Sequence, residues 1–148
     1  MMQTQKVIDV VELFSMVLGD KISDFTLPPE SFSVMQAEII AFSKKEKTLI
    51  TKMPVLASWN NPYGTMQGGF INAAIDNAVG PLSLLIAPAN ITRHMETKFL
   101  KSVTLETDYI LVKASLSEMK KRRLSFEVSV EDEKGEVFVQ AKVVNFIV

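Results

Sequence analysis

The chain contains no cysteine and only one histidine among its 148 residues. Without cysteine it can form neither a disulfide framework nor a thiolate zinc site, and it has no cysteine nucleophile. The single histidine, His94, leaves a metal site short of its most common ligand. We therefore expect no metal and no bound cofactor, so any chemistry must come from other side chains and from the backbone.

The chain also lacks a strong charge imbalance and a long apolar run. Its formal net charge is -1, which gives no reason to expect bulk electrostatic binding to nucleic acid or to a membrane surface. The first 20 residues carry three acidic side chains and therefore lack the apolar core of a signal peptide. The longest apolar run, 78–89, is interrupted by Pro81 and Pro88 and is too short to span a bilayer. We expect a cytoplasmic protein with neither nucleic-acid nor membrane partners.

The pattern of apolar residues predicts two helices and a series of strands. Helical spacing over residues 5–18 predicts an N-terminal helix that ends at Gly19, and residues 68–86 predict a long apolar helix. Runs with strand-like alternation, separated by polar turns, cover 33–43, 48–56, 91–101, 106–119, 122–132 and 136–148.

This order of elements predicts the fold. Strands joined by short polar turns indicate an antiparallel sheet, and a helix that is apolar on most sides indicates that the sheet wraps it. We therefore expect an α+β protein with the hot-dog fold, in which a curved antiparallel sheet of about six strands wraps one long central helix. We expect residues 1–24 to form an N-terminal helical extension and residues 25–148 to form the hot-dog domain.

A glycine-rich loop leads into the central helix. Gly68 and Gly69 stand where the helix is expected to begin, and a helix start presents unpaired N–H groups that suit a polarised carbonyl or an anion. Seven residues further on, Asp76 places a charge in an apolar helix, where it is costly unless it is paired or functional. The polar positions that share this helix face are Asn72, Asp76, Gly80 and Ser83. Such a stripe meets solvent, a partner chain or a ligand.

The spacing of these residues also predicts a dimer. Gly69 and Asp76 lie about 10 Å apart along the helix axis, at about 1.5 Å per residue, so one carbonyl cannot easily touch both. Two helices that run antiparallel across a two-fold axis would bring Gly69 of one subunit near Asp76 of the other. We expect a homodimer with two equivalent sites, and a dimer of dimers if a sheet edge or face pairs again.

The glycine loop resembles a known signature. Its pattern, N-x-x-G-T-x-Q-G-G-x(6)-D, is similar to the N-x-x-G-x-x-H-G-G-x(6)-D signature of hot-dog acyl-CoA thioesterases, in particular the phenylacetyl-CoA (PaaI-like) branch. Its residues are Asn61, Gly64, Thr65, Gln67, Gly68, Gly69 and Asp76. The run from Ile91 to Lys101 resembles the strand that follows the central helix in that family, and the resemblance covers about residues 33–148.

The resemblance implies hydrolysis of acyl-CoA to a carboxylate and free coenzyme A, with coenzyme A present only as part of the substrate. Asp76 would be general base or nucleophile, and the Gly69 N–H would stabilise the oxyanion. Asn61 would orient the carbonyl or the water, Thr92 would assist Asp76, and Gly68 would contact substrate. These roles suit a thioester, because thiolate is a good leaving group.

Gln67 stands where the family commonly has histidine. Glutamine can hold a loop by hydrogen bonds but cannot shuttle a proton near neutral pH, and we expect the histidine position to be structural. If that histidine transfers protons in the family, this chain would be slow or inactive. The alternative is a non-catalytic hot-dog protein that binds acyl-CoA or another apolar ligand. A hot-dog dehydratase or hydratase is disfavoured because no histidine lies in the glycine loop. By strand parity His94 shares a face with Thr92, yet we assign it no role.

The charged stretch 120–123 supplies the candidate contacts to the phosphates of coenzyme A. Arg122 and Arg123 suit phosphate by charge and by hydrogen bonding. Arg123 is the stronger candidate, since it adjoins the start of a predicted strand. A charged hairpin tip that is simply solvated is the competing interpretation.

Overall fold

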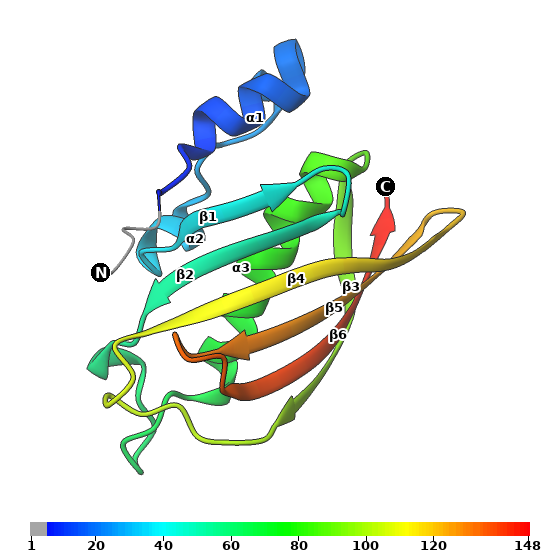
Figure 1. Ribbon diagram of the computed structural model, residues 1–148. Coiled ribbons are helices and arrows are strands. Elements are labelled where there is room, and N and C mark those ends of the chain that lie inside the picture. The colour runs from blue at the N-terminus through cyan, green and yellow to red at the C-terminus, as the bar shows by residue number, and fades with distance from the viewer. Residues whose placement is uncertain (1–5) are drawn as a thin grey trace.

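The structure, a computed structural model, describes residues 6–148. The N-terminal part contains two helices and a 3-10 segment, and the rest contains six strands, a short 3-10 segment and one long helix (Figure 1). In chain order the elements are α1 (Val10–Leu18), η1 (Gly19–Asp24), α2 (Glu30–Val34), β1 (Glu38–Ser43), β2 (Thr48–Pro54), η2 (Ala57–Trp59), α3 (Gly68–Ile86), β3 (Asn90–Phe99), β4 (Tyr109–Lys120), β5 (Arg123–Glu131) and β6 (Val137–Ile147).

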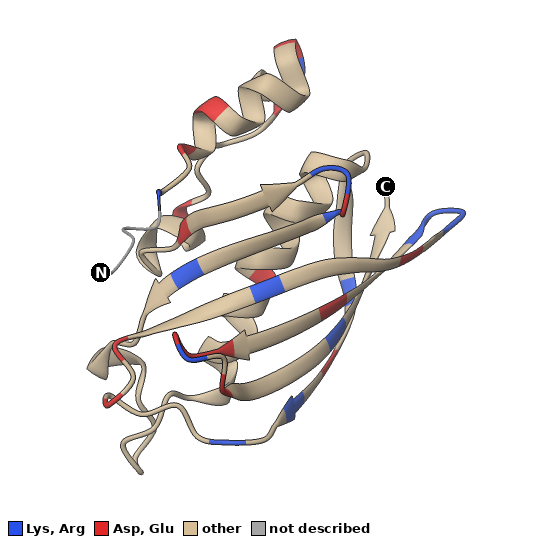
Figure 2. Ribbon diagram, viewed as in Figure 1, with Lys and Arg blue, Asp and Glu red and all other residues tan. Residues whose placement is uncertain are grey.

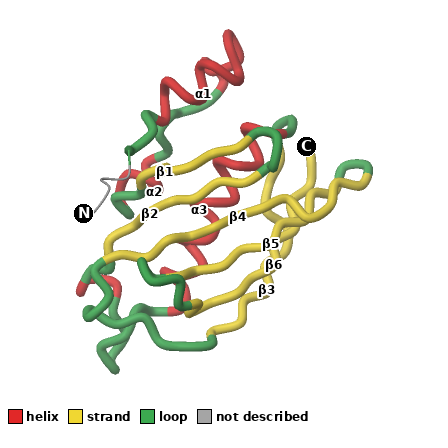
Figure 3. The backbone as a smooth tube through the Cα atoms, viewed as in Figure 1, coloured by secondary structure: helices red, strands yellow, loops and turns green. Residues whose placement is uncertain are grey.

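The strands form one curved antiparallel sheet in the order β1-β2-β4-β5-β6-β3 (Figure 3). The chain leaves β2, passes through α3 and returns at the far edge as β3, so β1 and β3 are the two edge strands. The predicted hot-dog fold is confirmed: six strands curve around one long helix, and an additional helix lies at the N-terminal end.

The core lies between α3 and the inner face of the sheet. Ala74 and Ala78 of α3 are fully buried, and their small side chains allow the helix to approach the strands closely. Inward-facing residues of the sheet, such as Val112 and Phe126, alternate with more exposed ones, as expected for a sheet with one covered face. The length and mean hydropathy (1.3) of α3 are also those of a membrane-spanning helix, but here it is packed as a core helix.

The N-terminal helix begins later than predicted, at Val10 rather than residue 5, which lies outside the described residues. Asp9 is the N-cap, and its carboxylate accepts a hydrogen bond from the backbone N–H of Glu12 at 2.8 Å. Ile8, just before the cap, pairs instead with Ile39 of β1. The apolar spacing was correctly interpreted as helical, but the capping side chain sets the start.

The first predicted strand is wrong over its first five residues. Residues 30–34 form α2, and β1 begins only at Glu38. Phe32 and Met35 are buried one helical turn apart, whereas Val34 is 70% exposed. Gln36 has a positive φ of 52°, which turns the chain into the strand. Burial of Phe32 and Met35 against the core therefore decides a local structure that alternation alone had assigned to a strand.

Candidate active site

The loop before α3 is held in shape by Asn61. Its side-chain oxygen accepts hydrogen bonds from the backbone N–H groups of Tyr63 (3.0 Å) and Thr65 (3.2 Å), and its amide donates to the Thr65 hydroxyl (2.9 Å). Gly64, inside this turn, has a φ of 79°, a conformation that glycine adopts without strain. The Asn61 side chain is thus engaged within its own loop, and one amide N–H remains for a ligand.

The first backbone N–H groups of α3, which follow this loop, have no backbone acceptor in the described part of the chain. Gln67 is the N-cap of α3: its N–H donates to the Trp59 carbonyl, and its carbonyl accepts from Phe70 and Ile71. Within residues 6–148, the backbone N–H groups of Gly68 and Gly69 donate to no backbone carbonyl. Gly69 is an exposed residue, and a Cβ built on it would meet nothing within 4 Å. The exposed Gln67 side chain makes no capping hydrogen bond to the helix, and the residue is held by its backbone hydrogen bonds.

The polar stripe of α3 faces the edge strand β3. The Thr92 hydroxyl donates to the Asp76 carboxylate at 2.8 Å, and the Thr97 hydroxyl donates to the Asn72 side-chain oxygen at 2.7 Å. The structure therefore brings Asp76 and Thr92 together as predicted. Asp76 is exposed, whereas Ser83, further along the same stripe, is buried. Thr97 is a contact that sequence reasoning missed.

His94 points to the other face of the sheet, contrary to the parity prediction. A bulge lies between Thr92 and His94, so Thr92 pairs with Asn145 whereas His94 pairs with the next residue along, Val144. Since neighbouring residues of β6 alternate between faces, and Asn145 is buried on the inner face, His94 faces outward. The extra residue, Arg93, broke the alternation on which the prediction rested.

The two candidate phosphate-binding arginines lie at the tip between β4 and β5, which carries a run of positive charge (Figure 2). Arg122 donates from Nε (3.1 Å) and Nη2 (2.7 Å) to the Ile147 carbonyl, so its guanidinium secures the last strand. Arg123 pairs with Phe146, which in turn pairs with Ile91, the neighbour of Thr92. The next residue of β5, Leu124, is fully buried on the inner face, so Arg123 faces outward, away from Asp76.

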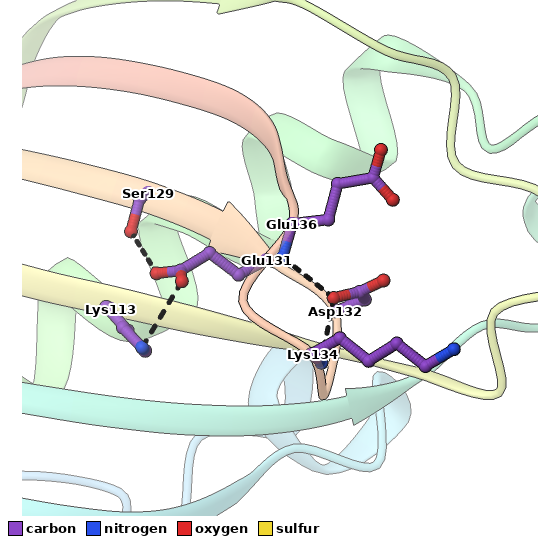
Figure 4. A network of polar contacts seen from close by, with 6 residues as sticks. All are labelled: Lys113, Ser129, Glu131, Asp132, Lys134 and Glu136. Carbon is purple, nitrogen blue, oxygen red and sulfur yellow. Dashed lines mark hydrogen bonds and ion pairs between the residues drawn. The ribbon is translucent and has the colours of Figure 1, made fainter.

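Other charged side chains gather on the outer face of the sheet, away from Asp76. Glu131, only 9% exposed, accepts from Lys113 at 3.3 Å and from the Ser129 hydroxyl at 2.8 Å (Figure 4). A groove of about 350 Å³ lies on the same face over β5, β6 and β3, with charged side chains such as Glu96 and Lys142. It is remote from the helix start, and its mixed charges resemble those of an ordinary solvated sheet face.

A second cavity, of about 290 Å³, adjoins the start of α3. It lies between the glycine loop, the first turn of the helix and the segment after β3. The residues that line it are Asn61, Thr65, Met66, Gly68, Ile71, Phe99, Leu100, Lys101, Ser102 and Val103. A hydrogen bond to Glu136 raises the pKa of Lys101, so this ammonium stays charged and paired. Among residues 6–148, no group of three acidic or histidine side chains is placed to hold a metal ion.

Comparison with protein families gives a match over more than half of the chain. The model of the thioesterase superfamily matches residues 63–139, which include the helix start, Asp76 and Thr92. The match therefore covers most of the candidate site as well as the central helix. A search among curated proteins finds no significant match to the sequence.

Several solved structures share the fold at low sequence identity. A phenylacetic acid degradation-related protein of Ralstonia eutropha JMP134 has a TM-score of 0.78 at 16% identity, over 91% of this chain and 98% of that one. A hypothetical thioesterase protein of Streptococcus pneumoniae TIGR4, solved with coenzyme A, has a TM-score of 0.72 at 18% identity, over 79% of this chain and 90% of that one. The PaaI protein of E. coli, from the phenylacetic acid degradation operon, has a TM-score of 0.73 at 14% identity, over 79% of this chain and 87% of that one. These likenesses establish the fold.

Proposed function

The chain belongs to the thioesterase superfamily, and we propose that this thioester hydrolase acts on acyl-CoA or aryl-acyl-CoA, releasing the free acid and coenzyme A. One observation carries the proposal: Asp76, hydrogen-bonded to Thr92, shares an open helix face with the free N–H of Gly69. Coenzyme A as the thiol is supported by the Streptococcus pneumoniae structure with the same fold, which was solved with coenzyme A.

The proposed reaction uses one carboxylate and one backbone donor. The thioester oxygen accepts a hydrogen bond from the Gly69 N–H, which stabilises the oxyanion. Asp76 of the partner subunit takes a proton from water as the water oxygen attacks the carbonyl carbon. The C–S bond then breaks, and the coenzyme A thiolate leaves and takes up a proton. Attack by Asp76 itself would give an anhydride that water then hydrolyses.

Thr92 fixes the orientation of the base. Its hydroxyl occupies one carboxylate oxygen of Asp76, at 2.8 Å, and leaves the other oxygen to accept the proton of the water. The carboxylate lies on a long helix and the hydroxyl on the neighbouring strand, so regular backbone holds both. Such support suits a general base, whose orientation toward the substrate must stay fixed.

We also propose that the working unit is a homodimer. Gly69 and Asp76 of one helix are about 10 Å apart along the axis, so a complete site combines one from each of two copies. The edge strand β3 has an unpaired side and carries half-exposed apolar side chains at both ends, Ile91 (46%) and Phe99 (52%). Pairing of β3 with a second β3 would also remove Asp76 from solvent.

The remaining predicted residues keep narrower roles in this proposal. Asn61 holds the loop and offers its last amide N–H to the substrate. Gln67 acts through its backbone, so replacement of the usual histidine does not remove a proton carrier that the mechanism needs. Arg123 remains the candidate contact for the phosphates of coenzyme A, which would have to extend to the outer face of the sheet to meet it, whereas the Arg122 guanidinium is already engaged by Ile147.

The experiment is a thiol-release assay on acyl-CoAs from short to long, including phenylacetyl-CoA, with Asp76→Asn beside the wild type. Loss of a general base predicts a fall in kcat of roughly 10²–10⁴-fold. Glu96→Gln is the matched control, because it makes the same acid-to-amide change on the outer face of β3 and should leave kcat unchanged.

An Asp76→Asn variant as fast as the wild type would refute the site. A wild type that binds acyl-CoA but releases no thiol would indicate a binding protein, the alternative that Gln67 favours, and Gln67→His would then be the variant to make.

A further inference from the structure

The cavity beside the helix start has an apolar floor and a polar rim. Met66, Ile71 and Val103 are 3%, 3% and 0% exposed, so the floor belongs to the rigid core. Asn61 lies at the rim, on the glycine loop. The one charged lining group, Lys101, is paired with Glu136 at 2.6 Å. An apolar group that enters here meets no unpaired charge.

The outer wall of this cavity is Phe99, near the end of β3. Its neighbour Thr97 shares its strand parity and contacts α3, so the Phe99 ring also lies on the helix side of the strand. A Cβ built on Gly68 would lie 3.3 Å from the ring Cζ and 3.5 Å from Cε1. The aromatic ring therefore rests on the backbone of the first helical residue, one position before the proposed oxyanion donor.

We propose that this cavity takes the acyl group of the thioester and that Phe99 sets the largest acyl group accepted. The inference rests on the proposed function, since the carbonyl must sit at Gly69 for the acyl chain to enter beside Gly68. The volume of about 290 Å³ is just below the ~300–1,000 Å³ typical of small-molecule pockets. The cavity thus suits a short chain or a single ring, and Phe99 blocks extension of the acyl group out through the wall.

The test is the dependence of kcat/KM on acyl length for the wild type and Phe99→Ala. In the wild type, kcat/KM should rise with length and then drop at a limit. Phe99→Ala should move that limit to longer chains, with a gain of about fourfold for each methylene newly buried, equivalent to ~0.8 kcal/mol. Leu105→Ala, which removes a 49% exposed apolar side chain outside the cavity, should leave the limit in place.

Gly68→Ala provides an independent measurement. Its methyl group would push the ring by a few tenths of an ångström, so it should penalise the longest accepted acyl group most. In the Phe99→Ala background this length-dependent penalty should vanish, because the ring that the methyl group meets is gone. If the alanine variant does not fold or does not dimerise, Phe99→Leu replaces it in both measurements, because it keeps an apolar side chain at the edge of β3.

The outcomes separate the two proposals. A wild type that hydrolyses acyl-CoAs, with the same length limit in Phe99→Ala and Phe99→Leu, overturns the role of Phe99 and leaves the thioesterase assignment standing. The role of Phe99 is also overturned if Gly68→Ala lowers kcat/KM by the same factor at every acyl length, with and without Phe99→Ala. A wild type without activity on any thioester overturns both proposals.

Discussion

The two edges of the sheet differ in what covers them. At the β1 edge the chain covers itself: the Ile8 N–H donates to the Ile39 carbonyl at 2.8 Å, and α2 lies beside the strand (Figure 1). At the β3 edge no element of residues 6–148 pairs with the outer side of the strand. Of the ten residues of β3, seven are exposed. The chain therefore covers the start of β1, which we call the closed edge, and within these residues leaves β3, the open edge, uncovered.

The central helix divides its polar residues between these two sides. Asn77 accepts from the Ser31 hydroxyl at 3.2 Å, and its amide reaches the Met35 sulfur at 3.3 Å, so it is tied to the N-terminal segment. Asp76, the preceding residue, is turned to β3 and Thr92. The chain thus anchors one side of α3 by its own contacts and leaves the side of Asp76 exposed, where we propose that a substrate and a second copy bind.

The largest loss of activity should come from placing a charge on the open edge, where it would prevent two β3 strands from pairing. Ile91→Glu would place an unpaired carboxylate where we propose that two β3 strands meet, at a cost of several kcal/mol. We expect the mass in light scattering to fall from twice 16.5 kDa to 16.5 kDa and thiol release to fall by at least about 100-fold, since ~2.7 kcal/mol corresponds to that factor.

Val34→Glu is the control at the closed edge. Val34 is 70% exposed on α2, so an added charge there meets only water and should change neither mass nor turnover. An Ile91→Glu variant that remains dimeric, or a wild type that is fully active as a monomer, contradicts the proposed dimer through β3.

The closed edge should matter for stability rather than for chemistry. Phe14 of α1 is 1% exposed, so Phe14→Ala should lower the free energy of unfolding by about 3–5 kcal/mol, as measured by denaturant titration. Met16→Ala, on the same helix but 79% exposed, should change it by less than about 0.5 kcal/mol. The folded Phe14→Ala protein should retain its kcat; a large loss of kcat at full folding would mean that α1 takes part in the site.

The smallest effects should separate the two adjacent residues of α3. Thr92→Val removes the hydrogen bond to Asp76 and should lower kcat by about 10–100-fold, the equivalent of ~1.5–3 kcal/mol for a bond to a charged group. Thr92→Ser should restore it. Asn77→Ala should instead cost about 1 kcal/mol of unfolding free energy and leave kcat unchanged. If both variants lose only stability, Thr92 is a structural partner.

Much of the fold and part of the site could be predicted because their signals are local. The central helix begins at Gly68 and ends at Ile86, as its apolar run and glycine start indicate. The distance of seven residues between Gly69 and Asp76 places both on one helix face whatever the surroundings. The contact of Thr92 with Asp76 was predicted from family resemblance, and the hydrogen bond between them agrees with it. The division at residue 24 and the catalytic roles stay predictions.

The errors arose where one residue or one distant contact changes a local pattern. The bulge at Arg93 reverses the face of His94, because a period of two cannot survive an inserted residue. Alternation over 33–37 suggested a strand, but burial of Phe32 and Met35 keeps this part in a helical turn. The polar stripe that carries Asp76 was expected to meet solvent, a partner chain or a ligand, and Asp76 is indeed exposed, but periodicity alone does not say that the stripe faces β3.

The sequence by itself determined the elements, their antiparallel order and the glycine-to-aspartate spacing, because each of these follows from periodicity and turn chemistry within short stretches. Only the tertiary structure decided that β3 rather than β1 is the open edge, that Asn77 is held by α2, and that the ring of Phe99 rests on Gly68. Those features join residues 31 to 46 positions apart, and such contacts are set by how the sheet curls around α3, which no local pattern encodes.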